Sequence, residues 1–309
     1  MTATPSRRSN AAARAESLTA WLFSAPAVLL LFVFLVVPFL MAFAFSLTDQ
    51  RLIPAPQLPT AFVGLRNYER MLEDTTLLRG LQNNFVFALV VVPVQSALAL
   101  ALAMLVNKKL RGINIFRTIF FTPVATTMTV VAIVWFILYN PQQGFINSFL
   151  STISGGALGP YRWLDDKALA LPSIMLLSIW QGVGFQMLIF LAGLQGIPKE
   201  LYEAAEIDGA SPWQQFWFVT LPQLRNTTIF VLISSTILAL QLFVQVYVMP
   251  QRGGPEDSTT TVIVRMVVEG FSNQRVGYAS AISVAFFVIV LLISLVQRLL
   301  LREERQVRA

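Results

Sequence analysis

The sequence predicts an all-α integral membrane protein with six transmembrane helices. Hydrophobic residues make up 56% of the 309 residues and charged residues only 12%, with a mean hydropathy of +0.67, whereas an ordinary soluble domain carries about 25% charged residues. Six long runs contain no Asp, Glu, Lys or Arg. Each run exceeds the roughly 20 residues that a helix needs to cross the hydrocarbon, and a helix satisfies its own backbone hydrogen bonds there.

The six charge-free runs are taken in chain order as one helix each. The first is too long for the apolar core of a signal peptide, which spans about 7–15 residues, so it is expected to remain as an uncleaved span. The third breaks at Asn140-Pro141 and turns rich in Gly and Ser over residues 151–160, which indicates one helix followed by a polar loop. The predicted spans are 19–46, 84–106, 118–139, 171–193, 227–249 and 277–297.

Basic residues set the expected orientation. Lys and Arg at 108–111 and in the tail at Arg298, Arg302 and Arg305 directly border predicted spans, where positive charge most strongly favours the cytoplasmic side. Both termini are therefore expected in the cytoplasm. The chain then consists of a cytoplasmic tail at 1–18, one transmembrane domain at 19–297 and a second cytoplasmic tail at 298–309.

Two segments are expected on the opposite, external side. Residues 62–79 carry apolar side chains at helical spacing and predict one interfacial helix lying on the outer surface. Residues 250–257, PQRGGPED, form a cluster of turn-favouring residues between the fifth and sixth spans.

The segment 198–222 is a charged insert between two apolar runs. Residues 199–207 favour a helix, and Gly209 stands where a left-handed residue would end it. Ser211-Pro212 resembles the N-cap and first turn of a second helix over 213–219. A solvated linker is the simplest reading, but four aromatic residues within 213–218 are costly to leave in water, which favours a docking element.

The insert resembles the EAA loop of the permease subunits of bacterial ABC importers. The motif consists of Glu203-Ala204-Ala205, then Gly209, then Val219-x-Leu221-Pro222, with Val219 where the family usually has Ile. Further segments resemble the sugar-importer branch, to which the maltose permease belongs. They are Phe62–Tyr68, Phe116–Thr118, Phe120–Pro123, Leu194–Pro198 and Asp208–Ala210.

The resemblance implies a type I ABC importer transmembrane domain whose cytoplasmic coupling helices seat in a cleft of an ATPase subunit. The chain has no G-x-x-x-x-G-K-[ST] phosphate loop, so ATP and Mg²⁺ are expected on a separate ATPase dimer, with no enzyme activity and no cofactor in this chain. A second permease, an external solute-binding protein and the lipid bilayer are the other expected partners. The residues expected to couple to the ATPase are Glu203, Ala204, Ala205, Asp208, Gly209, Leu221 and Pro222.

Polar and aromatic side chains in the fourth and fifth spans are candidates for a sugar path, because hydroxyl groups must exchange water for protein partners. Ser and Thr in membrane helices more often bond to their own backbone or to a neighbouring helix, and the partner permease could make the sugar contacts instead. The candidates are Trp180, Gln181, Phe185, Gln186, Ser235, Gln241 and Gln245.

The composition argues against several other classes. The chain has no Cys and no His, and no predicted span carries a carboxylate or a Lys, so an ion-coupled carrier, a charged-filter channel and a membrane enzyme are disfavoured. The basic residues do not gather on a soluble face, which argues against nucleic acid. A glycerol-phosphate or polyol importer and a non-transporting scaffold or sensor subunit stay open as alternatives to a carbohydrate importer in the bacterial inner membrane.

Overall fold

The computed structural model is helical along its described length, which comprises residues 10–53, 59–108, 112–249 and 253–301. Parts of four predictions lie outside these ranges: the N-terminal tail to residue 9, the basic loop at 109–111, the turn at 250–252 and the C-terminal tail from 302. The principal helices are α1 (Asn10–Leu31), α2 (Val37–Ser46), α4 (Thr75–Val106), α8 (Ala170–Gln195), α12 (Arg225–Leu240) and α15 (Val276–Leu301).

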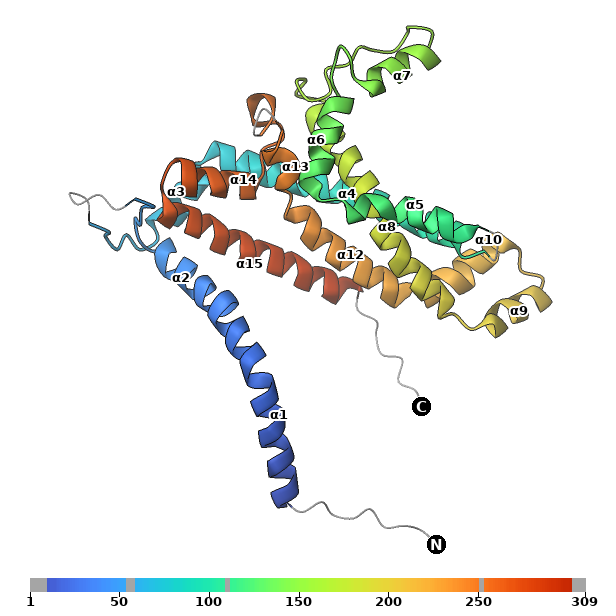
Figure 1. The fold of residues 1–309 in the computed structure, drawn as a ribbon, viewed down its shortest axis with the longest axis horizontal. Helices are drawn as coiled ribbons and strands as arrows, with labels where there is room; N and C mark the ends of the chain where they lie inside the picture. The colour runs from blue at the N-terminus through green and yellow to red at the C-terminus, as the bar shows by residue number, and fades with distance from the viewer. Residues whose placement is uncertain (1–9, 54–58, 109–111, 250–252, 302–309) are drawn as a thin grey trace.

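The core lies between α4 and α8, which make the most extensive contact of any helix pair, with α5 (Ile113–Ala125), α12 and α15 packed around them (Figure 1). Small residues such as Ala99 and Ala103 on α4 let it approach Met187 and Phe190 of α8, and all four are almost fully buried. In contrast, α1 leads away from this bundle (Figure 1), and its apolar side chains from Trp21 to Leu31 are exposed. The bundle therefore positions α4, α8 and α12 around a common interior.

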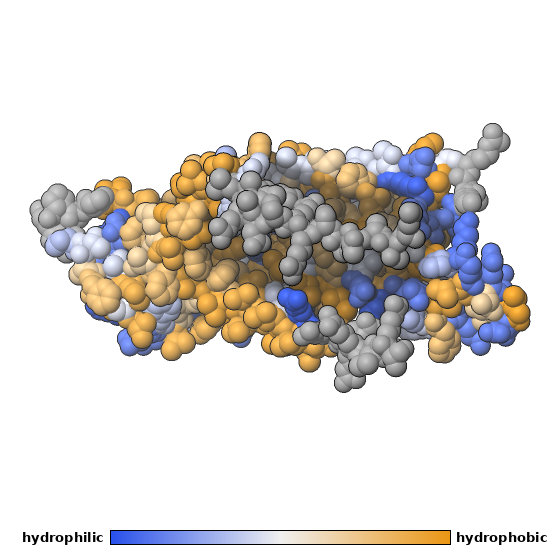
Figure 2. Space-filling view, turned by 90° about the horizontal axis from the view of Figure 1, so that it is seen from below, coloured by the Kyte–Doolittle hydropathy of each residue, from blue (hydrophilic) through white to orange (hydrophobic). Residues whose placement is uncertain are grey.

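Five helical stretches are long and apolar enough to cross a membrane. By length and composition, they coincide with the predicted first, second, fourth, fifth and sixth spans. Hydrophobic residues cover much of the middle of the face in Figure 2, whereas hydrophilic residues gather most densely at the end that carries the α9–α10 segment. The five stretches are Thr19–Ser46, Thr75–Val106, Ala170–Gln195, Arg225–Tyr247 and Val276–Leu301.

The predicted third span is not one continuous helix. It consists of α5 and α6 (Met128–Leu138), which meet at an angle of 97°. Thr126 and Thr127 between them are extended, with ψ of 137° and 139°, and Pro123 lacks the amide that would strengthen the last turn of α5. Hydropathy does not reveal such a bend, because the two halves together are apolar enough for a single span.

The predicted interfacial helix over 62–79 is wrong as a single element. The helix α3 (Arg66–Glu73) ends at Asp74, whose ψ of 91° breaks the helix and whose carboxylate accepts the Leu77 N–H at 3.0 Å as the N-cap of α4. The helix that contains the predicted second span therefore begins at Thr75, ahead of the predicted start of that span at residue 84. Its polar first turns are held by the chain around residues 256–262, where Arg79 donates to the Glu256 carbonyl and Asn83 to the Thr260 carbonyl.

Three further helical segments occur where only loops, or an uninterrupted span, were predicted. The helix α7 (Phe145–Ile153) follows α6, and α14 (Val262–Val267) continues into a π-helical turn at Val268–Ser272 just before α15. The fifth span is interrupted after Leu240 and resumes as the short α13 (Val244–Tyr247). Residues Pro255–Asp257 within the predicted turn cluster form one 3₁₀ turn.

The two ends of the bundle differ in the segments that form them. At one end, α8 leads through α9 (Lys199–Ile207) and α10 (Pro212–Gln215) into α12. At the other end, α3, α14 and the beginning of α15 come together (Figure 1). We call the first the coupling-loop end, after the loop at residues 198–222, and the second the α3 end.

Candidate functional site

The coupling loop, residues 198–222, contains the first predicted helix and turn. The helix α9 begins directly after Pro198 and ends at Ile207, and Gly209 follows with a φ of +76°. In this left-handed conformation the Gly209 N–H reaches the Glu206 carbonyl and the Ala210 N–H reaches the Ala205 carbonyl, which satisfies the last carbonyls of α9. The sequence-based expectations for this helix and for its left-handed glycine are confirmed.

The second half of the loop differs from the single helix predicted over 213–219. Ser211 and Gln214 form a reciprocal capping box, with the Gln214 side chain accepting from the Ser211 N–H at 2.7 Å. The helix α10 is only four residues long and widens into a π-helical turn over Phe216–Thr220, which ends where the Leu221 N–H bonds to the Phe216 carbonyl. The wider turn runs up to Pro222, which has no N–H of its own to continue the α-helical pattern.

Tertiary contacts fix the loop to the bundle at its base. The Tyr202 and Thr220 hydroxyl groups lie 3.0 Å apart and join α9 to the π-helical turn. Leu221 and Pro222 belong to the single turn α11 (Leu221–Gln223), and the next residue, Leu224, is buried against α8. The loop is thus a braced pair of helices rather than a free linker.

The outward surface of the loop combines apolar and acidic side chains. Ile207, Trp213 and Phe218 are 88%, 68% and 79% exposed, and Trp213 stacks on Phe216 with ring centroids 5.7 Å apart. Glu203 is exposed on α9 and forms no ion pair with any described residue. The other residues of the predicted motif also lie on this loop: Ala204, Asp208, Gly209 and Pro222 are exposed, and Ala205 and Leu221 are half-buried.

A second candidate site lies inside the bundle, in a cavity of about 240 Å³ between α4, α8 and the end of α12. We call it the amide cavity because five glutamines from these segments line it. Four of them were predicted, as was the nearby Ser235, so the structure brings these candidates together. The five glutamines are Gln95, Gln181, Gln186, Gln241 and Gln245.

Two predicted path residues do not line the amide cavity. Trp180 packs edge-on against Trp135 with ring centroids 5.6 Å apart, and both Trp180 and Phe185 are about half exposed on other faces of α8. Sequence reasoning instead missed Gln95 on α4. Its signal was present in the sequence, since Gln95 is a lone amide within a long apolar span.

Gln95 and Gln186 have unusual surroundings. A Cβ atom at Gly182 would lie 2.5 Å from the Gln95 Nε2, so any residue other than glycine at this position would displace the Gln95 amide. The Gln186 Nε2 donates to the Ser235 Oγ at 2.6 Å, while its Oε1 is buried with no partner among the described residues. A buried carbonyl oxygen without a donor is costly, and a hydroxyl group entering the cavity would supply one.

The break after α12 contributes Gln241 and Leu242 to the lining of the cavity. Gln241 follows the last residue of α12 with a ψ of 22°, and the chain does not resume a helix until Val244. Broken helices at membrane depth occur where they are buried in protein or line a cavity. Every residue that lines the amide cavity is uncharged, so it suits a neutral ligand with groups that donate and accept hydrogen bonds.

A metal centre finds no support in the described ranges, which hold no group of three or more Asp or Glu side chains able to surround an ion.

Comparisons with known proteins place the chain in a family. Residues 95–306 match the model of the binding-protein-dependent transport system inner membrane component. The diacetylchitobiose uptake system permease protein NgcF of Streptomyces coelicolor is 34% identical, covering 86% of this chain and 78% of its own length. The lactose transport system permease protein LacF of Rhizobium radiobacter is 35% identical, covering 92% and 94%.

A further permease and a solved structure are also similar to this chain. The trehalose/maltose transport system permease protein MalF of Thermococcus litoralis is 34% identical, covering 91% of this chain and 92% of its own length. A chain of a bacterial ABC transporter that imports the acidic polysaccharide alginate shares the fold, with a TM-score of 0.79 at 21% identity, over 94% of this chain and 98% of that one. The protein is a multi-pass inner-membrane permease subunit of a binding-protein-dependent ABC importer, not its ATPase, and belongs to the family of binding-protein-dependent transport system inner membrane components.

Proposed function

We propose that this permease forms one half of a path for a neutral mono-, di- or oligosaccharide. The observation that carries the proposal is the amide cavity, whose five glutamines and absence of charged lining residues suit sugar hydroxyl groups. The relatives named for diacetylchitobiose, lactose and trehalose/maltose support the same substrate class. A polyol phosphate fits less well, because no Lys or Arg lines the cavity to balance its charge.

The path opens and closes, in this proposal, through the coupling loop. A second permease completes the path, and each permease contacts one subunit of an ATPase dimer. Glu203 makes charged contacts in the ATPase cleft, Ala204 and Ala205 allow close approach, and Gly209 fixes the angle between α9 and α10. The exposed apolar side chains of the loop support this assignment, because a protein partner would remove them from water. A scaffold or sensor subunit would need the same surface but no amide cavity.

The proposed topology has six spans with both termini in the cytoplasm, counting α5 and α6 as one bent crossing. It places the coupling-loop end inside and the α3 end outside. Because the chain has no cysteine, one introduced cysteine is a unique label. We expect a membrane-impermeant maleimide to label Arg162→Cys in intact cells and Ile207→Cys only after permeabilisation. The opposite pattern would contradict the topology without testing the substrate.

The substrate is tested by uptake into proteoliposomes that contain the complete importer and its solute-binding protein. Radiolabelled maltose, lactose and diacetylchitobiose are compared with galacturonate and glycerol 3-phosphate. We expect ATP-dependent uptake of at least one neutral sugar and none of the two anions. Uptake confined to an anion would contradict the assignment of the uncharged amide cavity as the substrate path.

A glycine variant tests the cavity itself. Gly182→Val forces Gln95 out of its position, since even a Cβ there would lie 2.5 Å from the amide, and we expect it to abolish uptake of the neutral sugar. Gly196→Val, at the C-cap of the same helix, is the control, because the nearest atom to a Cβ there is 3.4 Å away. Equal uptake by the two variants would show that the substrate passes elsewhere.

A further inference from the structure

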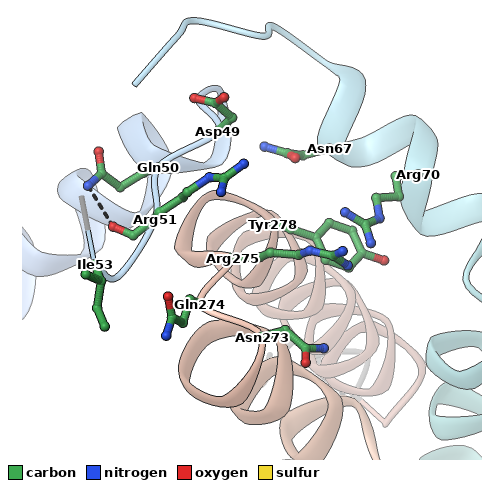
Figure 3. A pocket seen from close by; sticks show the side chains of 10 residues that line it. All are labelled: Asp49, Gln50, Arg51, Ile53, Asn67, Arg70, Asn273, Gln274, Arg275 and Tyr278. Atoms are coloured by element: carbon green, nitrogen blue, oxygen red, sulfur yellow. Dashed lines mark hydrogen bonds between the residues drawn. The ribbon is translucent and has the colours of Figure 1, made fainter. Parts of the chain in front are cut away.

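A polar cavity of about 490 Å³ lies at the α3 end of the bundle, far from the coupling loop (Figure 1). Residues 49–53, the helix α3, and the junction between the Val268–Ser272 turn and α15 surround it (Figure 3). We call it the arginine pocket, since each of these three segments contributes one arginine: Arg51, Arg70 and Arg275.

Arg275 pairs with Glu269 at 3.4 Å, but Arg51 and Arg70 form no ion pair with any described residue. Asp49 is the one carboxylate among the lining residues, and its Oδ1 already accepts the Ala61 N–H at 2.7 Å. Arg70 lies over the Tyr278 ring, 4.5 Å from its centroid. Guanidinium groups that converge on one cavity repel one another, and a carboxylate between them would relieve that repulsion through charge-assisted hydrogen bonds.

A buried ionic network holds the pocket in place. Glu269 is only 1% exposed and lies between Arg265 at 2.8 Å and Arg275 at 3.4 Å. Asp74 accepts from Arg265 and from the Tyr278 hydroxyl, the latter at 2.8 Å. Glu269 and Asp74 therefore hold Arg275 and Tyr278 in position on one wall of the pocket.

The opposite wall is anchored as well. Asn67 donates to the Ser46 and Thr48 carbonyls at 2.8 Å each, which fixes α3 to the end of α2. The Gly277 N–H bonds to the Gln50 carbonyl and the Leu52 N–H to the Gln274 carbonyl. A pocket whose walls are already ordered loses little entropy when a partner binds.

We propose that the arginine pocket docks an acidic side chain of the solute-binding protein. The inference rests on the proposed topology, which turns the α3 end outward. A binding-protein-dependent permease requires a solute-binding protein on its outer side. Because the pocket is positively charged, the side chain of the binding protein that enters it is acidic rather than basic or apolar. The pocket is separate from the amide cavity, so it takes part in docking and not in holding the sugar.

The experiment uses the complete importer in nanodiscs and the solute-binding protein that stimulates the ATPase of the wild-type complex. ATPase activity is measured against the concentration of sugar-loaded binding protein. We expect Arg51→Glu and Arg70→Glu each to raise the concentration for half-maximal stimulation about tenfold or more. The maximal rate should be recovered at high binding-protein concentration, and Arg51→Lys, which keeps the charge, should stay near the wild type.

Arg162→Glu is the matched control, because Arg162 is an exposed arginine outside the pocket that pairs only weakly with Asp165, at 3.7 Å. Its half-maximal concentration should change less than about twofold. Added salt should weaken stimulation of the wild type more than that of Arg51→Glu, since it screens exposed charges.

The outcomes separate the two proposals. If no binding protein stimulates the wild-type complex, the proposed function fails and this inference falls with it. If stimulation is normal in the wild type and unchanged in both glutamate variants, only the docking inference is overturned. It is also overturned if the variants respond normally to binding protein but lose inhibition by galacturonate or inorganic phosphate, because the pocket would then bind a small anion.

Discussion

The coupling-loop end of the molecule turns large apolar side chains outward, whereas the α3 end turns charged side chains inward. Ile207 and Phe218 are almost fully exposed at one end, while Asp74 and Glu269 are buried against Arg265 at the other. An exposed apolar surface gains free energy only when another molecule covers it, and a buried ion pair is costly to break when one partner is removed. The difference indicates that the apolar surface at the coupling-loop end is available to a partner, whereas the buried charges at the α3 end are paired within the chain.

The largest expected effect comes from changing Gly209, in the turn between α9 and α10. Gly209→Pro is incompatible with the φ of +76°, because proline fixes φ near −65°, and we expect it to abolish ATP-driven uptake while the permease still reaches the membrane. Gly209→Asn is the control, since asparagine tolerates left-handed conformations better than other residues, and should retain most activity. Normal uptake by Gly209→Pro would show that the angle between α9 and α10 does not transmit motion.

Charge reversal of Glu203 tests the same end without altering the backbone. We expect Glu203→Lys to lose uptake, because it would repel the basic contacts proposed in the ATPase cleft. The thermal unfolding temperature of the permease should not fall, since Glu203 is exposed and forms no ion pair with any described residue. A variant that unfolds earlier would assign Glu203 a role inside the permease.

The exposed apolar surface should matter for assembly and not for stability. Phe218→Asp should weaken binding of the ATPase subunit by about 2 kcal/mol, or about thirtyfold in affinity, measured by titrating ATPase into permease-containing nanodiscs. Leu72→Asp changes a similarly exposed apolar residue on α3 and should leave ATPase binding unaltered. Equal losses of ATPase affinity in the two variants would show that exposed apolar residues at the coupling-loop end matter no more for ATPase binding than those at the α3 end.

The α3 end should respond in the opposite way, with a loss of stability. Asp74→Asn keeps an N-cap for α4 but removes the charge that faces Arg265, and we expect the free energy of unfolding to fall by about 1–3 kcal/mol. Burial favours the protonated form of Asp74, but hydrogen bonds from the Leu77 N–H, the Tyr278 hydroxyl and Arg265 outweigh it and hold the pKa below its ordinary value.

The lowered pKa of Asp74 fixes the direction of the pH dependence. Its contribution is fully present above the pKa in the unfolded chain, about 3.9, and is lost as the pH falls through the lower folded value. The difference in unfolding temperature between wild type and Asp74→Asn should therefore be constant from about pH 6 to 8 and narrow below about pH 4. Glu256→Gln, which breaks the exposed 2.7 Å pair with Lys167, should change stability much less.

The smallest expected effect concerns the cap of α10. Ser211→Ala removes the hydroxyl that accepts the Gln214 N–H, which is one of the two hydrogen bonds of the capping box. This loss costs about 1 kcal/mol of local stability. Amide hydrogen exchange of residues 212–216 should become faster, while Ser211→Thr should restore protection. Unchanged exchange would mean that contacts such as Trp213 with Phe216, and not the cap, hold α10.

Local signals predicted the coupling turn well. Gly209, Ser211 and Pro212 act on the backbone within a few residues of themselves, so their pattern is informative before any tertiary contact is known. The same holds for long apolar runs, which specify a helix because lipid offers the backbone no partner. The π-helical turn at Phe216–Thr220 lies beyond this range, because it depends on how Thr220 and Leu224 pack against Tyr202 and α8.

Contacts between distant segments explain what could not be predicted. Between the fifth and sixth spans the sequence indicated only turn-favouring residues at 250–257, yet Glu269 in the same segment is buried because Arg265 pairs with it and Asp74 pairs in turn with Arg265. Gln95 seemed an isolated amide until α4 packed against α8 at Gly182. The angle of 97° between α5 and α6 likewise depends on packing, since the two helices together are apolar enough for one span and hydropathy does not mark the bend.

By itself, the sequence determined the membrane class, the long helices, the family motif and the left-handed turn at Gly209. These features depend on solvent transfer and on backbone conformation, which act locally and leave a periodic or positional signature. Only the tertiary structure decided which glutamines share a cavity, where the spans bend and which charges are buried. Those features depend on free energies of pairing between residues far apart in the chain, and a pair has no signature in either segment alone.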